Sequence, residues 1–183
     1  MCCASPPEEL EHAIANHRPD SHGLTVLPFV AGERAPGWHD TAQAIFQGMT
    51  PATTPTEIYI AVLEAIAYRF AQIQHRLMPV LSTNSVGKPL SVVASGGALT
   101  KSPAWMQLMA DVLGMDIIAS NEPELTARGA AVLALLQLGL IEQLDAVKPA
   151  AEAIYRPDQR HRARYGAAIQ RQAELYARNY GGG

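Results

Sequence analysis

Two adjacent glycines, Gly96 and Gly97, follow the short apolar run Leu90–Ala94 and precede a helix signal at Ser102-Pro103. A strand that ends in paired glycines before a helix brings backbone N–H groups and a helix N-terminus to the carboxyl edge of a sheet, which suits a phosphate. Open α/β sheets also bind ligands at this edge. A tight turn without a ligand would need the same residues, so the pair alone favours neither interpretation.

Several other chemistries lack their residue patterns. No Gly-Lys-Ser/Thr follows at P-loop spacing, and no Gly-x-Gly-x-x-Gly follows a strand. Ser95 lacks the Gly-x-Ser-x-Gly context of a hydrolase nucleophile. The six histidines, which include His12, His17, His22 and His39, show no paired spacing on one element. We therefore expect no metal site built from histidine and cysteine.

Two charged clusters have open interpretations. Glu33 and Arg34, in Gly-Glu-Arg ahead of Pro36 and Trp38, would either form a local ion pair or face a cleft. The cluster Arg160, His161, Arg162 and Arg164 resembles an anion site, but a solvated helix face is the simpler explanation and the one we favour.

Thr54-Pro55-Thr56-Glu57 is a strong helix start, because Thr54 can cap, Pro55 suits the first turn and Glu57 can complete a capping box. Apolar residues then recur at helical spacing to about Leu77 and predict a helix packed on more than one side. That stripe comprises Ile58, Val62, Ile66, Phe70, Ile73 and Leu77. Further helices are predicted at Pro7–Asn16, at Pro103 to Gly114, at Leu125–Leu138 and at Asp158–Tyr180.

Three short apolar runs read as strands, namely Leu24–Val30, Leu90–Ala94 and Met115–Ala119. The stretch Ala31–Pro51 is rich in glycine and proline and is predicted to be an irregular connection. Strand and helix alternate from Leu90 onward, which favours an α/β layer with two parallel strands.

The composition of the chain narrows the class of protein. The 183 residues are 48% hydrophobic and 17% charged, which is typical of a globular domain. A net charge of −3 gives no reason to expect nucleic acid or an anionic membrane as a partner. No apolar run approaches the length of a bilayer span. The two cysteines, Cys2 and Cys3, suggest no disulfide framework, so we expect a cytoplasmic protein.

Four motifs together resemble one family. They are LPFVAGERAPGW, TPTEIYIAVLEAIAYRF, VVASGGALTKSPAWMQLMADVLGMDI and EPELTARGAAVLALLQLG. In this order and spacing, from about Glu8 to Leu140, they resemble the C-terminal lobe of the FGGY carbohydrate kinases, and Gly-Glu-Arg-x-Pro-x-Trp is most similar to the gluconokinase-like branch. We expect residues 8–150 to form part of that lobe and residues 151–183 to form its C-terminal helical tail.

The resemblance implies an actin-like, ribonuclease-H-like ATPase fold that transfers the γ-phosphoryl of MgATP to a sugar or polyol, with gluconate favoured. It implies that Gly96, Gly97 and Ala98 lie against the nucleotide, and that Lys101 lies near the adenine, where some members carry asparagine. Ala65 replaces a glycine common in the family, a change that a helix tolerates.

The resemblance also implies that much of the kinase lies outside this sequence. The two phosphate hairpins, the catalytic aspartate and the first strands of the lobe are not found here. We therefore expect no catalytic residue and no metal ligand in this chain, Mg²⁺ being carried by the nucleotide, and no phosphoryl transfer without the N-terminal lobe as partner. An exposed sheet edge and apolar surface are expected where the strands would pack. The alternatives are a non-catalytic module that binds nucleotide or a partner lobe, and a Rossmann-type protein, which the missing fingerprint disfavours.

Overall fold

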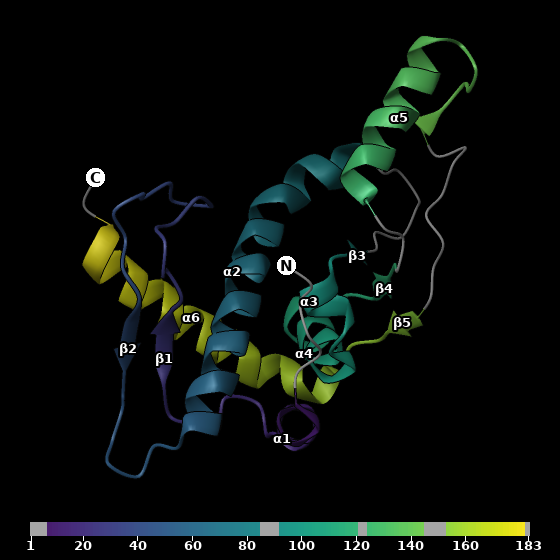
Figure 1. Ribbon diagram of the computed structural model, residues 1–183. Helices are drawn as coiled ribbons and strands as arrows, with labels where there is room; N and C mark the ends of the chain where they lie inside the picture. The colour runs from purple at the N-terminus through teal and green to yellow at the C-terminus, as the bar shows by residue number, and fades with distance from the viewer. Residues whose placement is uncertain (1–6, 85–91, 121–123, 145–152, 182–183) are drawn as a thin grey trace.

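A computed structural model describes residues 7–84, 92–120, 124–144 and 153–181 (Figure 1). The helices are α1 (Glu8–Asn16), α2 (Pro55–Asn84), α3 (Gly97–Thr100), α4 (Pro103–Leu113), α5 (Leu125–Gln137) and α6 (Arg162–Tyr180), with the 3-10 turn η2 (Gln159–His161) before the last. The strands are β1 (Thr25–Leu27), β2 (Ile45–Gln47), β3 (Val92–Ala94), β4 (Ile117–Ala119) and β5 (Ala153–Tyr155).

Two small sheets lie on either side of α2 (Figure 1). In one, β1 and β2 pair antiparallel, with Val26 opposite Phe46. In the other, β4 lies between β3 and β5. The parallel pairing of β3 with β4 confirms the predicted α/β layer, whereas β5 runs antiparallel to β4. Within the described residues, β3 has a paired strand on one side only.

Two strands were not predicted. The composition of Ala31–Pro51 predicts an irregular connection, but Ile45–Gln47 forms β2. The tail was assigned no strand, but Ala153–Tyr155 forms β5. Each has three residues and depends on hydrogen bonds to a distant strand, so the local sequence carries little signal for it.

The helix starts confirm the capping signals. The backbone N–H of Glu57 donates to Thr54 Oγ1 at 3.2 Å, and the N–H of Thr54 donates to Glu57 Oε2 at 2.8 Å, which completes the capping box. Ser102 Oγ accepts from the N–H of Trp105 at 3.2 Å at the start of α4. That helix ends at Gly114, in the left-handed conformation that glycine favours.

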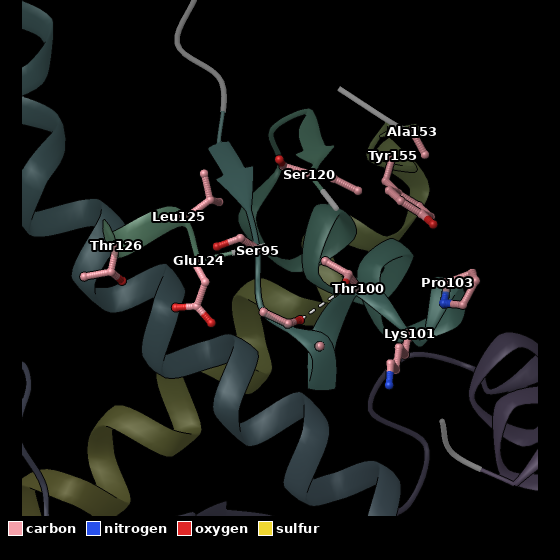
Figure 2. A pocket seen from close by; sticks show the side chains of 13 residues that line it. Ser95, Thr100, Lys101, Pro103, Ser120, Glu124, Leu125, Thr126, Ala153 and Tyr155 are labelled. Carbon is pink, nitrogen blue, oxygen red and sulfur yellow. Dashed lines mark hydrogen bonds between the residues drawn. The ribbon is translucent and has the colours of Figure 1, made fainter. Parts of the chain in front are cut away.

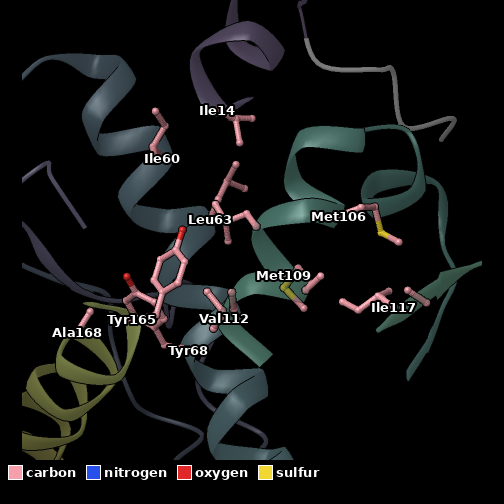
Figure 3. Packing of buried hydrophobic residues seen from close by; sticks show 14 of the residues in the cluster. Ile14, Ile60, Leu63, Tyr68, Met106, Met109, Val112, Ile117, Tyr165 and Ala168 are labelled. Atoms are coloured by element: carbon pink, nitrogen blue, oxygen red, sulfur yellow. The ribbon is translucent and has the colours of Figure 1, made fainter. Parts of the chain in front are cut away.

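The main core lies between α2, α4 and the second sheet, and α1 and α6 close its sides (Figure 3). Its most deeply buried members include Ile60, Leu63, Met106, Met109 and Ile117. Smaller clusters join the other side of α2 to β1, and β1 to α6. The first half of α2 is therefore packed on more than one side, as predicted, and it sets the position of both sheets.

The second half of α2 departs from this pattern. Phe70 and Leu77, both members of the predicted stripe, are 49% and 50% exposed. They line an apolar groove of about 290 Å³ that continues onto Met115 and onto Val92, at the edge of β3 that has no strand partner among the described residues. Further along the chain, α5 buries none of its residues. Among the described residues, no helix is long and apolar enough to cross a bilayer.

This apolar groove should make the isolated chain self-associate, because apolar surface and an unpaired strand edge favour pairing with a second copy. We expect sedimentation velocity to show a dimer or larger species, and Leu77→Lys to shift it toward monomer. His75→Lys adds the same charge on the same helix at an exposed residue outside the groove and should leave the distribution unchanged. Equal behaviour of the two variants would contradict the role of the groove.

Candidate functional site

A cavity of about 700 Å³ opens at the carboxyl ends of β3 and β4 (Figure 2). Ser95 and Ser120, the residues that follow the two strands, both line it. Because β3 and β4 run parallel, their carboxyl ends meet at one edge of the sheet, where open α/β sheets bind ligands. The N-termini of α4 and α5 contribute Pro103 and Leu125 to its walls.

Gly96 and Gly97 lie on this cavity for different physical reasons. Gly96 has φ +104° and ψ 130°, a conformation essentially confined to glycine, so the turn itself requires it. Gly97 has no such constraint, and a Cβ added to it would meet only Lys101 Cε, at 3.9 Å. Neither the backbone nor the packing of the described residues requires Gly97 to lack a side chain. The open space beside it is the cavity.

Three of the four predicted site residues come together here. Gly96, Gly97 and Lys101 line the cavity, Lys101 from the C-terminal end of α3. Ala98 lies in α3, and its side chain is outside the described part of the structure. The turn is held locally, since the carbonyl of Gly96 accepts hydrogen bonds from the backbone N–H and the hydroxyl of Thr100, both at 3.1 Å.

The sequence analysis assigned no role to several other lining residues. Glu124 and Thr126 lie across the cavity from Lys101 and Pro103 (Figure 2), and Tyr155 of β5 lies at another wall. Glu124 and Thr126 belong to the quoted motif EPELTARGAAVLALLQLG, so the motif pointed to this segment without identifying the side chains. The cavity thus offers backbone amides and an ammonium group on one side and a carboxylate on the other.

Glu33 is buried and bonded to other elements of the fold, whereas the sequence analysis expected either a local ion pair with Arg34 or a position facing a cleft. Its carboxylate pairs with Arg69 of α2 and accepts from the Tyr176 hydroxyl of α6 at 2.6 Å and the N–H of Gly37 at 3.1 Å. Burial, followed by the hydrogen bond to Glu33, raises the pKa of Tyr176 to about 12. Arg34 is exposed. Glu33 therefore joins the loop to α2 and α6.

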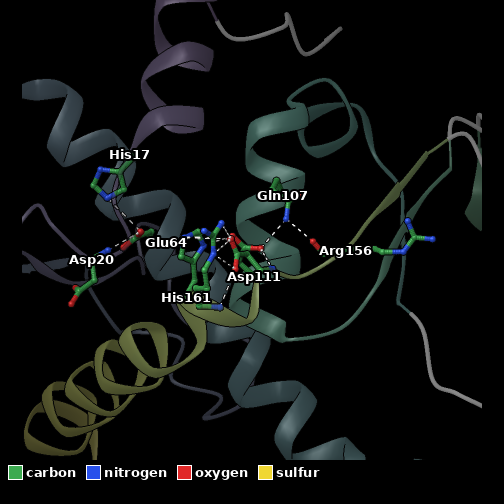
Figure 4. A network of polar contacts seen from close by, with 9 residues as sticks. His17, Asp20, Glu64, Gln107, Asp111, Arg156 and His161 are labelled. Carbon is green, nitrogen blue, oxygen red and sulfur yellow. Dashed lines mark hydrogen bonds and ion pairs between the residues drawn. The ribbon is translucent and has the colours of Figure 1, made fainter.

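A second buried carboxylate, Glu64 of α2, lies beside two histidines from the segment before β1, His17 and His22. Figure 4 shows His17 next to Glu64. Nε2 of His22 and of His17 lie 3.0 Å and 3.5 Å from its oxygens, and the Tyr68 hydroxyl donates at 2.7 Å. The ligand-type atoms of these histidines and Glu64 lie within 4.8 Å of one another, so the prediction from spacing missed a cluster that the fold assembles.

The hydrogen bonds favour a proton-bridged cluster at Glu64 over a metal centre. The backbone N–H of Leu24 donates to Nδ1 of His22 at 2.9 Å, which requires a lone pair on that nitrogen. The proton of the neutral ring then lies on Nε2, which donates to Glu64. A metal would need the lone pair of Nε2, so binding would cost the bond from Leu24.

A parallel strand pair that opens on a glycine-floored cavity, covered by helices, defines part of an α/β ATPase lobe of the actin-like fold, as predicted. The C-terminal domain of the FGGY family of carbohydrate kinases matches residues 6–138. The chain therefore belongs to the FGGY family.

Relatives of similar sequence are named for different substrates. Glycerol kinase of Corynebacterium efficiens is 32% identical over 134 residues, which cover 73% of this chain and 25% of that protein. Gluconokinase of Bacillus subtilis is 30% identical over 139 residues, 76% of this chain and 26% of that protein. The chain thus spans about a quarter of the length of these relatives, and it is equally similar to kinases for different substrates.

Solved structures agree with the fold. Gluconate kinase from Lactobacillus acidophilus superposes with a TM-score of 0.77 at 28% identity, over 93% of this chain and 34% of that one. Xylulose kinase from the same organism gives 0.77 at 27% identity with the same coverage. Glycerol kinase of Plasmodium falciparum with ADP gives 0.70 at 28% identity, over 94% of this chain and 34% of that one.

Proposed function

We propose that this chain is the nucleotide-binding part of a carbohydrate kinase, with ATP or ADP held in the cavity at the carboxyl edge of β3 and β4. The observation that carries the proposal is the open space beside Gly97. A side chain at this position would fit among the described residues, so their packing does not explain the glycine, whereas a bound nucleotide would. Gly96, Gly97 and Ala98 approach the phosphates and ribose, and Lys101 lies at the adenine side. The cavity volume of about 700 Å³ is within the range of small-molecule sites.

The chemistry of phosphoryl transfer is shared with the rest of the kinase. Transfer needs a base for the acceptor hydroxyl and groups that stabilise charge on the phosphoryl oxygens. We assign no catalytic residue and no Mg²⁺ ligand to this chain. In this proposal MgATP binds to the cavity, and the groups that contact the acceptor lie in the larger remainder of the kinase. The acceptor is a carbohydrate hydroxyl, and a gluconate-like sugar acid is the first substrate to test.

Nucleotide binding is tested by calorimetric titration of ATP and ADP into the purified chain. Gly97→Trp should weaken binding at least about tenfold, because an indole would occupy the space beside the phosphates. Gly166→Trp is the matched control, since Gly166 is exposed on α6 and a Cβ there meets nothing within 4 Å. Equal binding by Gly97→Trp and Gly166→Trp would overturn the assignment of the site.

The division of labour is tested by activity measurements with gluconate, glycerol and xylulose as acceptors. The chain alone should transfer no phosphoryl group to any of them. Addition of the remaining part of a family kinase should restore transfer, and the preferred acceptor then identifies the substrate. Transfer by the chain alone would contradict the assignment of the catalytic groups to the remainder.

A further inference from the structure

A pair of hollows, separate from the nucleotide cavity, lies between the end of α1, α4 and the start of α6. The outer hollow, of about 440 Å³, and the inner one, of about 170 Å³, share His17, Pro19 and His161, so they form one continuous depression. None of their lining residues belongs to the nucleotide cavity. We call this pair of hollows the basic depression.

Three arginines surround its mouth, namely Arg18, Arg160 and Arg164. Arg160 is neutralised by Asp158, whose Oδ2 lies 2.6 Å from its guanidinium. Within the described part of the chain, Arg18 and Arg164 make no side-chain hydrogen bond and no ion pair, and both are exposed. Arg18 is brought to Arg164 from the other end of the chain. Two guanidinium groups with free donors at one hollow suit a phosphate, which arginine binds in a bidentate manner.

This arrangement distinguishes members of the cluster that the sequence analysis assigned to a solvated helix face. Arg160, His161 and Arg164 line the basic depression, whereas Arg162 is not among its residues and extends toward Gly114. The cluster is therefore divided between the basic depression, which Arg160, His161 and Arg164 line, and the surface near Gly114, toward which Arg162 extends. All three arginines of the cluster are exposed, as the simpler interpretation expects, and the hollow that Arg160 and Arg164 line is an additional observation.

The inner hollow is lined by polar as well as apolar side chains, and its polar members Gln107, Asp111 and His161 belong to the network drawn in Figure 4. Asp111 lies at its wall with a buried carboxylate that accepts from Gln107 at 2.8 Å and from His161 Nδ1 at 2.7 Å. Because a carboxylate only accepts, the proton lies on Nδ1 of His161. Nε2 lies 4.0 Å from Asp158 Oδ2, beyond hydrogen-bond distance, and remains for a ligand. Ile14 and Leu108 supply apolar surface. A negative charge and a small volume disfavour a second anionic group here and favour an uncharged polar tail.

We propose that the basic depression binds the phosphate monoester of a small polyol. The phosphate lies at the mouth, against Arg18 and Arg164, and the uncharged hydroxyl-bearing end enters the inner hollow beside His161 and Asp111. This site is independent of the nucleotide cavity and of the proposed kinase function.

The test is a titration of the purified chain followed by ¹H–¹⁵N NMR, with glycerol 3-phosphate, inorganic phosphate and glycerol as probes. We expect glycerol 3-phosphate to bind more tightly than inorganic phosphate and glycerol not to bind. The variant Arg18→Ala/Arg164→Ala should weaken glycerol 3-phosphate binding at least about tenfold. The control Arg34→Ala/Arg162→Ala removes the same charge from exposed residues outside the depression and should leave binding within about twofold.

Two results would contradict the proposal, and two crossed measurements separate this site from the nucleotide site. Equal binding by the two double variants would overturn the site, and inorganic phosphate binding as tightly as glycerol 3-phosphate would overturn the ligand class. Both replaced arginines are exposed, so the variants should keep the wild-type circular dichroism. ATP binding should be unchanged in Arg18→Ala/Arg164→Ala, and Gly97→Trp should leave glycerol 3-phosphate binding unchanged, so failure of one proposal is distinguishable from failure of the other.

Discussion

Replacement of Glu33 by alanine should lower the free energy of unfolding by about 3–5 kcal/mol. The Glu33 carboxylate and the Arg69 guanidinium are 1% and 7% exposed, so the change leaves a buried cation without its counter-charge. Arg69 lies over the rings of Phe29 and Tyr176, at 5.1 Å and 4.6 Å from their centroids, and those rings compensate only part of the loss. The Tyr176 hydroxyl and the N–H of Gly37 lose their acceptor as well.

Urea denaturation followed by circular dichroism measures the effect, and two further variants make it specific. Arg34→Ala removes the neighbouring exposed charge and should change stability by no more than about 0.5 kcal/mol. Glu33→Gln keeps an acceptor for Arg69 without the charge, so its loss should be intermediate, and it serves as the readout if the alanine variant does not fold. A loss in Arg34→Ala as large as in Glu33→Ala would show that the loop, and not the buried pair, carries the stability.

The helices were predictable because their signals are local. The capping box of Thr54 and Glu57 involves residues three apart, and Ser102 caps the N–H of Trp105 at the same separation. Such contacts form in the same way whatever the rest of the chain does. The pairing direction of β3 and β4 followed from the helix between them, since a strand–helix–strand unit in one sheet runs parallel.

What could not be predicted depends on residues far apart in the sequence. Glu33 was expected either to pair with Arg34 or to face a cleft, but its partners Arg69 and Tyr176 lie 36 and 143 residues away. The periodicity of α2 predicted an apolar stripe that includes Phe70 and Leu77, and it could not show that this end of the helix lacks a covering element among the described residues. Periodicity reports which residues share a face, not what packs on it.

The candidate site likewise combines residues that a local motif predicts with residues that only the tertiary fold brings together. Gly96, Gly97 and Lys101 come from one short motif and were found together, because a turn of six residues fixes their proximity. Glu124 and Tyr155 reach the same cavity from later elements, and only the sheet order β3-β4-β5 brings them there. No spacing in the sequence encodes that order.

Acid should destabilise the protein through Glu64, whose side chain is fully buried. Burial raises the pKa of this carboxyl, but its contacts with His17, His22, Tyr68 and the N–H of Asp20 outweigh burial and lower the pKa from 4.5 to about 2. A pKa that is lower in the folded state means that the stabilisation is fully present above pH 4.5 and is lost as the pH falls toward 2. The difference corresponds to about 3 kcal/mol.

The variant Glu64→Gln isolates this contribution, because glutamine does not titrate. At neutral pH it should be less stable than the wild type, and the difference should shrink as the pH falls from 4.5 to 2, where the wild-type carboxyl becomes protonated. Glu142→Gln replaces an exposed glutamate and should follow the wild-type pH dependence throughout. Urea midpoints at several pH values measure all three proteins. A difference between wild type and Glu64→Gln that stayed constant from pH 7 to pH 2 would mean that Glu64 is held by its shape and hydrogen bonds and not by its charge.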